Sequence, residues 1–334
     1  MNQNKTTTQT KALGLCSGGL DSILSALVLK KQGLEVTWIS FETPFFDTLA
    51  AKKAAKNFNI PLIVKEITDV YMEMMRSPKT GFGKNMNPCM DCHTLMFSLA
   101  GALMKEKGFD FLFSGEVAGQ RPKSQTKNAL RYVEKHSGFD GYILRPLSAK
   151  LLPETLAEQE GLVDREQLLD ISGRGRKRQM ALAQEFKIKD FPSPAGGCLL
   201  TDKGFSQRLR DLLYVQKTEY PGQLHLLKHG RHFRIGEKTK LVVGRNQRDN
   251  KKIMALYNAQ DHIRLRHADL AGPDALMFGD MTEEQILTGA KILAGYTKAE
   301  PGIVTQVKIF QGQDTRKVSV ATPAPGKFQD LLIH

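Results

Sequence analysis

The sequence contains no apolar stretch that approaches the roughly 20 residues needed to cross a bilayer. Its N-terminal residues 1–10 are polar and rich in Thr and Gln, and they lack the apolar core of a secretory signal. Internal repeats and low-complexity tracts are also missing. These absences predict a cytoplasmic protein without a membrane partner, which begins with a disordered tail over residues 1–10.

Cysteine is scarce, with four among the 334 residues: Cys16, Cys89, Cys92 and Cys198. In a cytoplasmic protein such cysteines are more often metal ligands, catalytic groups or buried side chains than disulfide partners. Charge is plentiful and unbalanced, since the formal net charge is +13 and the pI is about 9.5. A polyanionic partner such as nucleic acid suits that charge, although many soluble proteins are simply basic.

Strand-like and helix-like segments alternate along the first half of the chain, which predicts a parallel sheet covered on both faces. The expected strands are 11–16, 34–41, 61–67, 111–114 and 142–144, and the expected helices are 21–32, 47–57 and 92–107. A helical pattern broken by Gly173 and Gly175 covers 153–186. Beyond about residue 213 the runs become shorter, β-like and basic, as in 240–243. We therefore expect an α/β domain over 11–205 and a smaller C-terminal α/β domain over 206–334.

The segment SGGLDS, residues 17–22, follows the first predicted strand and opens a predicted helix. Its two glycines permit a tight turn that exposes successive amide groups, and the helix N-terminus adds a partial positive charge. These features alone would also fit a generic strand–turn–helix junction. The full six-residue string, however, resembles the pyrophosphate-binding loop of the N-type ATP pyrophosphatases (PP-loop enzymes). By this resemblance the ATP site contains Ser17, Gly18, Gly19, Asp21 and Ser22, with Mg²⁺ and with adenine at Ser40 and Phe41.

The cysteines also match a known pattern. The C-x-x-C pair of Cys89 and Cys92 precedes a predicted helix, where two sulfurs can serve a metal, a cluster or redox chemistry, and where a thiol pKa is commonly lowered. NPCMDC resembles the segment with the first catalytic cysteine of bacterial tRNA 2-thiouridylases, and PAGGCLLTD, which contains Cys198, resembles the segment with their second. Cys16 we interpret as a small apolar residue that ends the first strand.

Two sulfur chemistries follow from this resemblance. In one, either Cys92 or Cys198 carries a persulfide and the other cysteine resolves it by forming a disulfide. In the other, the three thiolates of Cys89, Cys92 and Cys198 hold a [4Fe-4S] cluster with one iron open to exogenous sulfide. Cys89 favours the cluster, because a persulfide relay needs no third thiol. Zinc would lack an obvious fourth ligand beside His93.

A second signature, SGEVAGQRPKSQTKNAL, follows the strand predicted at 111–114. It resembles the T-G-E-x-x-G-Q-x-x-S-Q-T segment of tRNA 4-thiouridine synthetases, in which Gly115, Glu116 and Gln120 correspond to nucleotide-site residues. The alternative is that this segment merely caps the following helix. Arg121 and Lys123 depart from the family pattern and are candidates for phosphate or RNA contacts.

Basic residues gather in two places. Arg174, Arg176, Lys177 and Arg178 form a cluster before a helix, which is either a solvated face or an RNA contact. Residues 226–253, with HADLAGPDALMF at 267–278, resemble the RNA-binding domain of the NFACT family. This resemblance makes Arg231, Arg234, Arg245 and Arg248 candidate RNA contacts, although a surface ion pair is the commoner use of any one arginine.

Together the resemblances imply an ATP-dependent tRNA thiolation enzyme that adenylates a uridine carbonyl and replaces its oxygen with sulfur from sulfide or a persulfide carrier protein. Two other readings stay open at this point. One is a PP-loop ligase or amidotransferase that acts on a small molecule, for which the thiols would have no function. The other is a non-catalytic RNA-binding factor.

Overall fold

The computed structural model describes residues 9–191, 198–217 and 222–334. The chain divides into two compact units, residues 1–198 and 199–334. The boundary expected from the sequence, between residues 205 and 206, falls inside helix α8 (Lys203–Arg210) of the second unit. Most of the tail expected over residues 1–10 lies outside the described residues.

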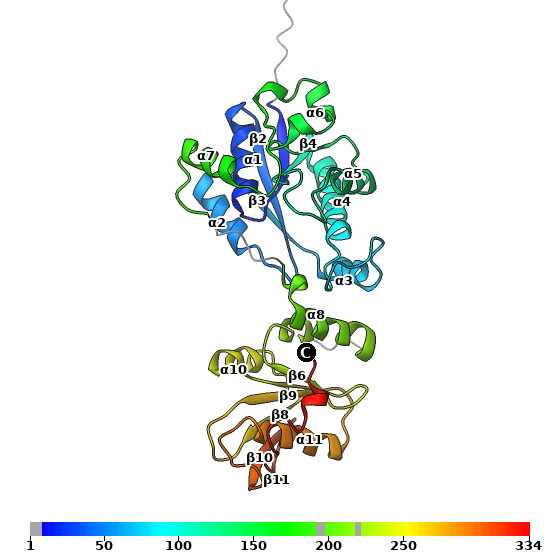
Figure 1. The fold of residues 1–334 in the computed structure, drawn as a ribbon, viewed down its shortest axis with the longest axis vertical. Coiled ribbons are helices and arrows are strands. Elements are labelled where there is room, and N and C mark those ends of the chain that lie inside the picture. Colours follow the sequence, from blue (N-terminus) through cyan, green and yellow to red (C-terminus); the bar gives the residue numbers. More distant parts are fainter. Residues whose placement is uncertain (1–8, 192–197, 218–221) are drawn as a thin grey trace, which may run out of the picture. The chain divides into compact units, whose positions relative to one another are not determined.

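The first unit is built on a five-stranded parallel sheet with the strand order β3-β2-β1-β4-β5. Its strands are β1 (Lys11–Leu15), β2 (Glu35–Glu42), β3 (Leu62–Glu66), β4 (Phe111–Ser114) and β5 (Ile143–Leu144). Its helices are α1 (Leu20–Lys31), α2 (Leu49–Phe58), α3 (Thr68–Arg76), α4 (Cys89–Lys107), α5 (Lys127–His136), η1 (Ala149–Leu151), α6 (Leu156–Gln159), η2 (Arg165–Gln167) and α7 (Lys177–Glu185). Figure 1 shows α1, α2 and α7 on one side of the sheet and α3, α4 and α5 on the other.

The expected α/β sheet is confirmed, and no end of these elements differs from the expected one by more than three residues. The alternating pattern identified β1 to β5, α1, α2 and α4, because each has a clear apolar period. Helix α3 was not expected from the sequence. The long helical region expected at 153–186 is instead three short helices, α6, η2 and α7, separated by loops.

Close packing of β1 against β4 fixes the centre of the sheet. Gly14 pairs in register with Phe113, and a Cβ at Gly14 would lie 2.1 Å from the Phe113 ring. The ring therefore occupies the space that a side chain on β1 would fill. Because β1 and β4 are adjacent, the segments that follow them emerge side by side at the carboxyl edge, where α/β sheets place their ligands.

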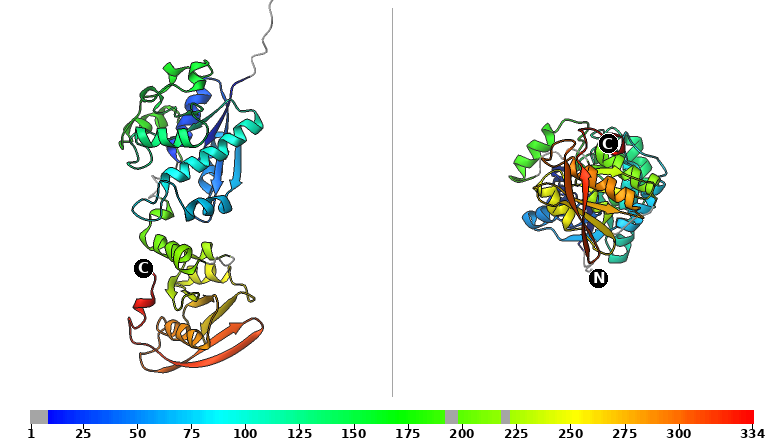
Figure 2. Two further views of the ribbon diagram at one scale, coloured as in Figure 1. Left: turned by 90° about the vertical axis from the view of Figure 1, so that its right-hand side faces the viewer. Right: turned by 90° about the horizontal axis from the view of Figure 1, so that it is seen from below.

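The second unit contains a six-stranded sheet with the order β11-β10-β8-β9-β7-β6, all of whose pairs are antiparallel. Its strands are β6 (Arg231–Arg234), β7 (Lys240–Val243), β8 (His262–His267), β9 (Asp274–Phe278), β10 (Val304–Gln311) and β11 (Asp314–Ala321). Its helices are η3 (Leu199–Thr201), α8, η4 (Asp211–Gln216), α9 (Gln223–Leu226), α10 (Gln247–Met254), α11 (Glu283–Ala294) and η5 (Gln329–Leu331). Figure 2 shows β10 and β11 as a long hairpin.

Both faces of this sheet are covered by apolar packing. Side chains of α11, such as Ile286 and Leu293, pack with Leu241 and Met277 on one face. Ile253 of α10 packs with neighbouring strand residues on the other face. The smaller C-terminal α/β domain expected from the sequence is thereby confirmed.

A buried ion cluster fastens η4 to this sheet. Asp211 accepts hydrogen bonds from Arg234, and the Lys240 Nζ lies 3.3 Å from an Asp211 oxygen without hydrogen-bond geometry. Lys240 is fully buried, and this burial lowers the pKa of its ammonium group to about 8. One carboxylate therefore faces two cations, of which Lys240 is fully buried.

Lys240→Met is expected to change the free energy of unfolding at pH 7 by less than about 1 kcal/mol, because Asp211 keeps Arg234 and a buried charge is removed. Since the folded-state pKa lies below the usual 10.5, the unmodified protein gains stability as the pH rises from 8 to 10.5, and the variant lacks this gain. Urea unfolding at several pH values measures both effects. Asp211→Asn is the contrasting variant and is expected to cost about 3–5 kcal/mol. Equal losses in the two variants would contradict this explanation.

Candidate nucleotide and thiol site

The loop between β1 and α1 is shaped as an anion site. Gly19 precedes the first residue of α1, so no side chain caps the amide groups there, and Ser22 Oγ donates to the Gly19 carbonyl at 2.8 Å. Ser17 Oγ accepts from the Gly19 N–H at 3.3 Å. The unpaired amide groups and the helix dipole favour a bound phosphate group.

Two glycines bring separate segments against this loop. Gly18 has φ +74°, and a Cβ there would lie 2.2 Å from the carbonyl carbon of Ala50 in the first turn of α2. A Cβ on Gly115, which follows β4, would lie 2.4 Å from the backbone of both Asp21 and Ser22. The absence of side chains at these positions is therefore what lets α2 and the end of β4 reach the loop.

Asp21 and Gln120, which the sequence analysis assigned separately to the nucleotide site, are in contact. Gln120 Nε2 donates to Asp21 Oδ2 at 3.0 Å. Asp21 Oδ1 is buried and has no hydrogen-bond partner among the described residues. Burial raises the pKa of the Asp21 carboxyl, and Gln120, Arg176 and Arg121 oppose this shift.

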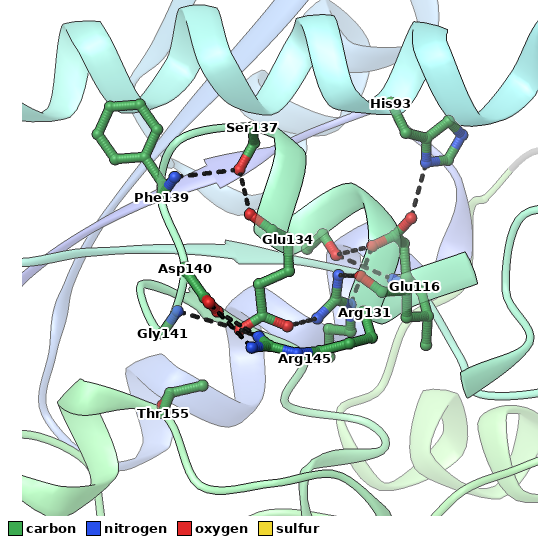
Figure 3. A network of polar contacts seen from close by, with 12 residues as sticks. His93, Glu116, Arg131, Glu134, Ser137, Phe139, Asp140, Gly141, Arg145 and Thr155 are labelled. Carbon is green, nitrogen blue, oxygen red and sulfur yellow. Dashed lines mark hydrogen bonds and ion pairs between the residues drawn. The ribbon is translucent and has the colours of Figure 1, made fainter. Parts of the chain in front are cut away.

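Glu116 is the centre of a buried polar network (Figure 3). Its carboxylate accepts from Arg145 Nε at 3.1 Å and from Ser114 Oγ at 3.2 Å, and it lies 2.7 Å from His93 Nδ1. Arg145 also binds Glu134 and the Leu130 carbonyl. Although burial alone would raise it, the charges of Arg145 and His93 lower the pKa of Glu116 to about 2. Glu116 thus joins the end of β4 to α4 and α5.

The stability of the first unit is expected to fall with acid because of Glu116. A folded-state pKa of about 2, below the usual 4.5, means that the ionised carboxylate stabilises the fold above pH 4.5. This contribution is lost as the pH falls from 4.5 to 2. Glu116→Gln should lower stability at pH 7 and flatten the change over that window, as measured by urea unfolding. Glu185 forms an exposed ion pair with Lys31. Glu185→Gln should therefore neither lower stability at pH 7 nor change its pH dependence.

The rest of the second signature folds on itself. Thr126 Oγ1 accepts from the Ala129 N–H at 3.1 Å and so caps α5. The Gly119 N–H donates to the Gln125 carbonyl at 2.6 Å, and both Ser124 and Gln125 are buried. Some residues of this segment therefore form a turn and cap α5, while Gln120 contacts Asp21.

Ser40 and Phe41, the residues expected at adenine, are both buried near the end of β2. Phe41 lines a cavity of about 390 Å³ between the β2–β3 edge and helices α3 and α4, with Asp69 and Leu103 among its other walls. Ser40 does not line that cavity, since successive strand side chains point to opposite faces. The adenine assignment stays a prediction.

Cys89 and Cys92 lie in the first turn of α4. Asn87 Nδ2 donates to Cys89 Sγ at 3.3 Å, and the hydroxyl of the fully buried Tyr71 donates to Cys92 Sγ at 3.6 Å. The ring of Tyr71 packs edge-on against Phe46, with ring centroids 5.4 Å apart. Tyr71 was not found in the sequence analysis, because it belongs to no motif and its helix, α3, was not expected.

Cys198 acts electrostatically on Cys92 although it is more than a hundred residues away in the sequence. The charges of Cys198 and Cys89 both act on Cys92, and both also act on Tyr71. Cys198 is exposed, and no disulfide involves the four cysteines, all of which are described. The preceding residues 192–197, including Gly196 and Gly197 of the quoted motif, lie outside the described part.

The thiol environment differs from the expectation of a lowered pKa. The protein atoms around Cys92 raise the pKa of its thiol to about 12, and only the Tyr71 hydroxyl works against that rise. Burial is the main cause of this rise, and the charges of the neighbouring thiols add to it. Within residues 9–191, 198–217 and 222–334, no three His, Cys, Asp or Glu side chains form a group that could hold a metal ion.

The thiols connect to the phosphate loop through a short chain of contacts. His93 follows Cys92 on α4 and binds Glu116 at 2.7 Å, and Gly115 before Glu116 lies against Asp21 and Ser22. Cys16 lies beneath the loop, where it is buried, accepts from the Gly18 N–H, and has a pKa raised to about 11 by burial. These features agree with its interpretation as a small packed residue.

The basic cluster before α7 has mixed surroundings. Arg178, which is exposed like Arg174 and Lys177, forms an ion pair with Asp170 at 2.6 Å. Arg176 lies close enough to Asp21 to lower its pKa. This last proximity was not foreseen, since the sequence grouped Arg176 with the RNA contacts.

The candidate RNA contacts of the second unit also differ among themselves. Arg234 and Arg245 are engaged by Asp211 and Asp249, respectively. The Arg231 guanidinium lies 4.6 Å from the centre of the Tyr296 ring. Arg248 is exposed and forms no ion pair with any described residue. Arg231 and Arg248 are therefore more available for RNA than Arg234 and Arg245.

No described helix is long and apolar enough to span a membrane.

Comparison with protein families assigns both halves of the chain. The family model described as thiamine biosynthesis protein (ThiI) matches residues 7–150. The model described as NFACT protein RNA binding domain matches residues 230–329.

Individual relatives support the same assignment. A tRNA-specific 2-thiouridylase MnmA of Endomicrobium trichonymphae is 31% identical over 211 residues, which cover 55% of this chain and 57% of that protein. MnmA 2 of Thermoanaerobacter sp. (strain X514) is 26% identical over 266 residues, which cover 68% and 67%. The chain thus spans little more than half the length of the first relative. Residues 7–150 are a PP-loop domain of the ThiI family, and residues 230–329 are an NFACT-type RNA-binding domain.

Proposed function

We propose that this protein is an ATP-dependent tRNA thiouridine synthase. The observation that carries the proposal is the position of Cys89 and Cys92 in the first turn of α4, where Cys198 acts electrostatically on Cys92. At the same end of α4, His93 and Glu116 link the helix to the phosphate loop. A ligase that transfers ammonia or an amine has no use for such a group of thiols. The relatives named as tRNA 2-thiouridylases and the RNA-binding domain further support a tRNA substrate.

The first step is activation of the base. ATP binds with its phosphates at Ser17–Ser22, and the RNA-binding domain holds the tRNA, with the target uridine flipped out of its stack. The uridine carbonyl oxygen attacks the α-phosphorus, the bond to the β-phosphate breaks, and pyrophosphate leaves. Loop amides and the α1 N-terminus stabilise the negative charge that develops.

Magnesium fits this site. Asp21 Oδ1 is a buried carboxylate oxygen without a partner among the described residues, and hard oxygen ligands together with phosphates are what Mg²⁺ prefers. Asp21 would hold the ion, whose charge offsets that of the polyphosphate. Gln120 orients the same carboxylate through its other oxygen.

The second step is sulfur insertion. Sulfur attacks the activated carbon and AMP leaves with the former carbonyl oxygen. In a persulfide relay, Cys92 or Cys198 carries a persulfide whose terminal sulfur makes the attack. The thiolate of the other cysteine then attacks the persulfide-carrying Sγ, so the S–S bond to the base sulfur breaks, thiouridine is released and a Cys92–Cys198 disulfide remains. Alternatively, Cys89, Cys92 and Cys198 would hold an iron–sulfur cluster, which supplies an open iron for sulfide.

The three thiols match a cluster in number and in ligand chemistry, but as placed among the described residues they do not form a group that could hold a metal ion. The raised pKa of the Cys92 thiol opposes its ionisation, so ligation through Cys92 would release a proton and weaken as the pH falls. The extra thiol Cys89 supports the cluster over the relay. Sulfide or a persulfide carrier protein is the proposed sulfur donor.

Nucleoside mass spectrometry of tRNA tests the proposal. Deletion of the gene should remove one thiolated nucleoside, and the mass and retention time of that nucleoside distinguish a 2-thio from a 4-thio product. An unchanged nucleoside profile would reject the proposal in favour of a small-molecule ligase or a non-catalytic RNA-binding factor. Iron and acid-labile sulfide in anaerobically purified protein distinguish the cluster from the relay.

A further inference from the structure

The Asp21 carboxylate is approached from two directions. Gln120, in the segment after β4, donates to its Oδ2. On the other side, α7 packs against α1 and brings Gln179 beside the same carboxylate. The two amides come from segments almost sixty residues apart, and both meet the first turn of α1.

Gln179 is an unusual buried residue. It is fully buried, and neither its amide nitrogen nor its amide oxygen has a hydrogen-bond partner among the described residues. Its amide lies next to Asp21, but no atom pair between them reaches hydrogen-bond geometry. An unsatisfied buried amide costs about 1–3 kcal/mol, so a bound ligand that satisfies it would recover this cost.

Two guanidinium groups accompany the amides. Arg121 adjoins Gln120 in sequence, and Arg176 immediately precedes α7, one helical turn before Gln179. Both act on the Asp21 charge. Among the described residues neither forms an ion pair, whereas the nearby Arg178 binds Asp170. The loop is thus flanked by two cations that form no ion pair with any described carboxylate.

We propose that Arg176 and Arg121 together bind the β- and γ-phosphates of ATP, the part that leaves as pyrophosphate, and that Gln179 positions Asp21 between them. The inference rests on the proposed function and deepens it, because it transfers Arg176 from the RNA surface to the nucleotide site. Guanidinium groups bind phosphate oxygens in a bidentate fork. When the α–β phosphate bond breaks, charge accumulates on the leaving group, where this pair stabilises it.

Polyphosphate suits these observations better than RNA backbone does. A backbone phosphate carries a single charge and is commonly met by exposed lysines and arginines. Arg176 is half-buried, and its neighbour Gln179 is completely enclosed beside the phosphate loop. Arg174 and Lys177, on the same segment, are exposed and remain the RNA candidates there.

Calorimetric titration of the full chain with inorganic pyrophosphate and magnesium tests this assignment without tRNA or sulfur. Arg176→Gln should weaken pyrophosphate binding about 10- to 100-fold, which is the range for hydrogen bonds to a charged group. Arg176→Lys keeps the positive charge but loses the bidentate guanidinium. Its pyrophosphate affinity should lie between those of Arg176→Gln and the unmodified protein. Arg131→Gln on α5 removes the same group from an exposed ion pair and should bind like the unmodified protein.

The tRNA affinity of the same variants separates the two assignments. Arg174→Gln should weaken tRNA binding more than Arg176→Gln does. The inference is overturned if Arg176→Gln binds pyrophosphate normally while its tRNA affinity falls. If the unmodified protein binds no pyrophosphate, the proposed function fails together with the inference. If the unmodified protein binds pyrophosphate and Arg176→Gln binds it equally well, only the inference is rejected.

Gln179→Leu tests the positioning role, which a purely structural residue would not have. Removal of an unsatisfied buried amide should leave the melting temperature unchanged or raise it. The magnesium concentration for half-maximal pyrophosphate binding should nevertheless rise severalfold, because a leucine offers Asp21 no amide to bind once the ion and pyrophosphate are present. A stable variant with an unchanged magnesium requirement would contradict the role of Gln179.

Discussion

Cys92→Ser is expected to lower the rate of thiouridine formation by at least about 10³-fold, the loss typical when a group that reacts covalently is removed. A serine hydroxyl neither carries a persulfide nor serves as a soft ligand for iron. Base activation should survive, since Cys92 lies on α4 and does not belong to the phosphate loop. The measurements are single-turnover thiolation by mass spectrometry and tRNA-dependent exchange of pyrophosphate into ATP.

Substitution of the other cysteines distinguishes the two sulfur chemistries. Cys16→Ser should retain thiolation within a few-fold, because a hydroxyl can still accept from the Gly18 N–H. A cluster requires that Cys89→Ser and Cys198→Ser both resemble Cys92→Ser. A persulfide relay requires that Cys89→Ser stay active. Full turnover by Cys92→Ser would remove the basis for sulfur chemistry and would revive the small-molecule ligase.

The sheet and its phosphate loop could be predicted because their signals are local. A short apolar run, two glycines and an amphipathic helix identify β1, the loop and α1 without knowledge of distant residues. Family resemblance added Gln120, whose contact with Asp21 spans 99 positions. Sequence alone gives no such pairing, since a glutamine after a strand has many possible partners.

The surroundings of the site could not be predicted for the same reason. Tyr71 reaches Cys92 only because α3 folds against α4, and no spacing in the sequence signals that packing. In the sequence Gln179 is an ordinary helix residue, and only the packing of α7 against α1 brings it beside Asp21. Glu116 fits a nucleotide-site motif, but its oxygens are occupied by Arg145, Ser114 and His93. Motifs identify chemistry, whereas burial decides which atoms remain available for it.

Gly18→Ala is expected to destabilise the first unit by about 3 kcal/mol or more, and to abolish measurable ATP binding. Two costs combine. An alanine at φ +74° costs about 1–2 kcal/mol in any context. Its Cβ would also lie 2.2 Å from the Ala50 carbonyl carbon, and backbone atoms at that distance must separate, which is a strain of the kind that produces large mutational effects.

Gly33→Ala isolates the first cost. Gly33 also has a left-handed φ, +86°, but a Cβ there would meet no atom within 4 Å. This variant should therefore lose only about 1–2 kcal/mol and should bind ATP normally. Urea unfolding and titration with ATP compare the two variants directly. The difference between their stabilities measures the contact of the loop with α2. If that difference is near zero, α2 does not press on the loop, and the close approach of α2 cannot be what shapes the phosphate site.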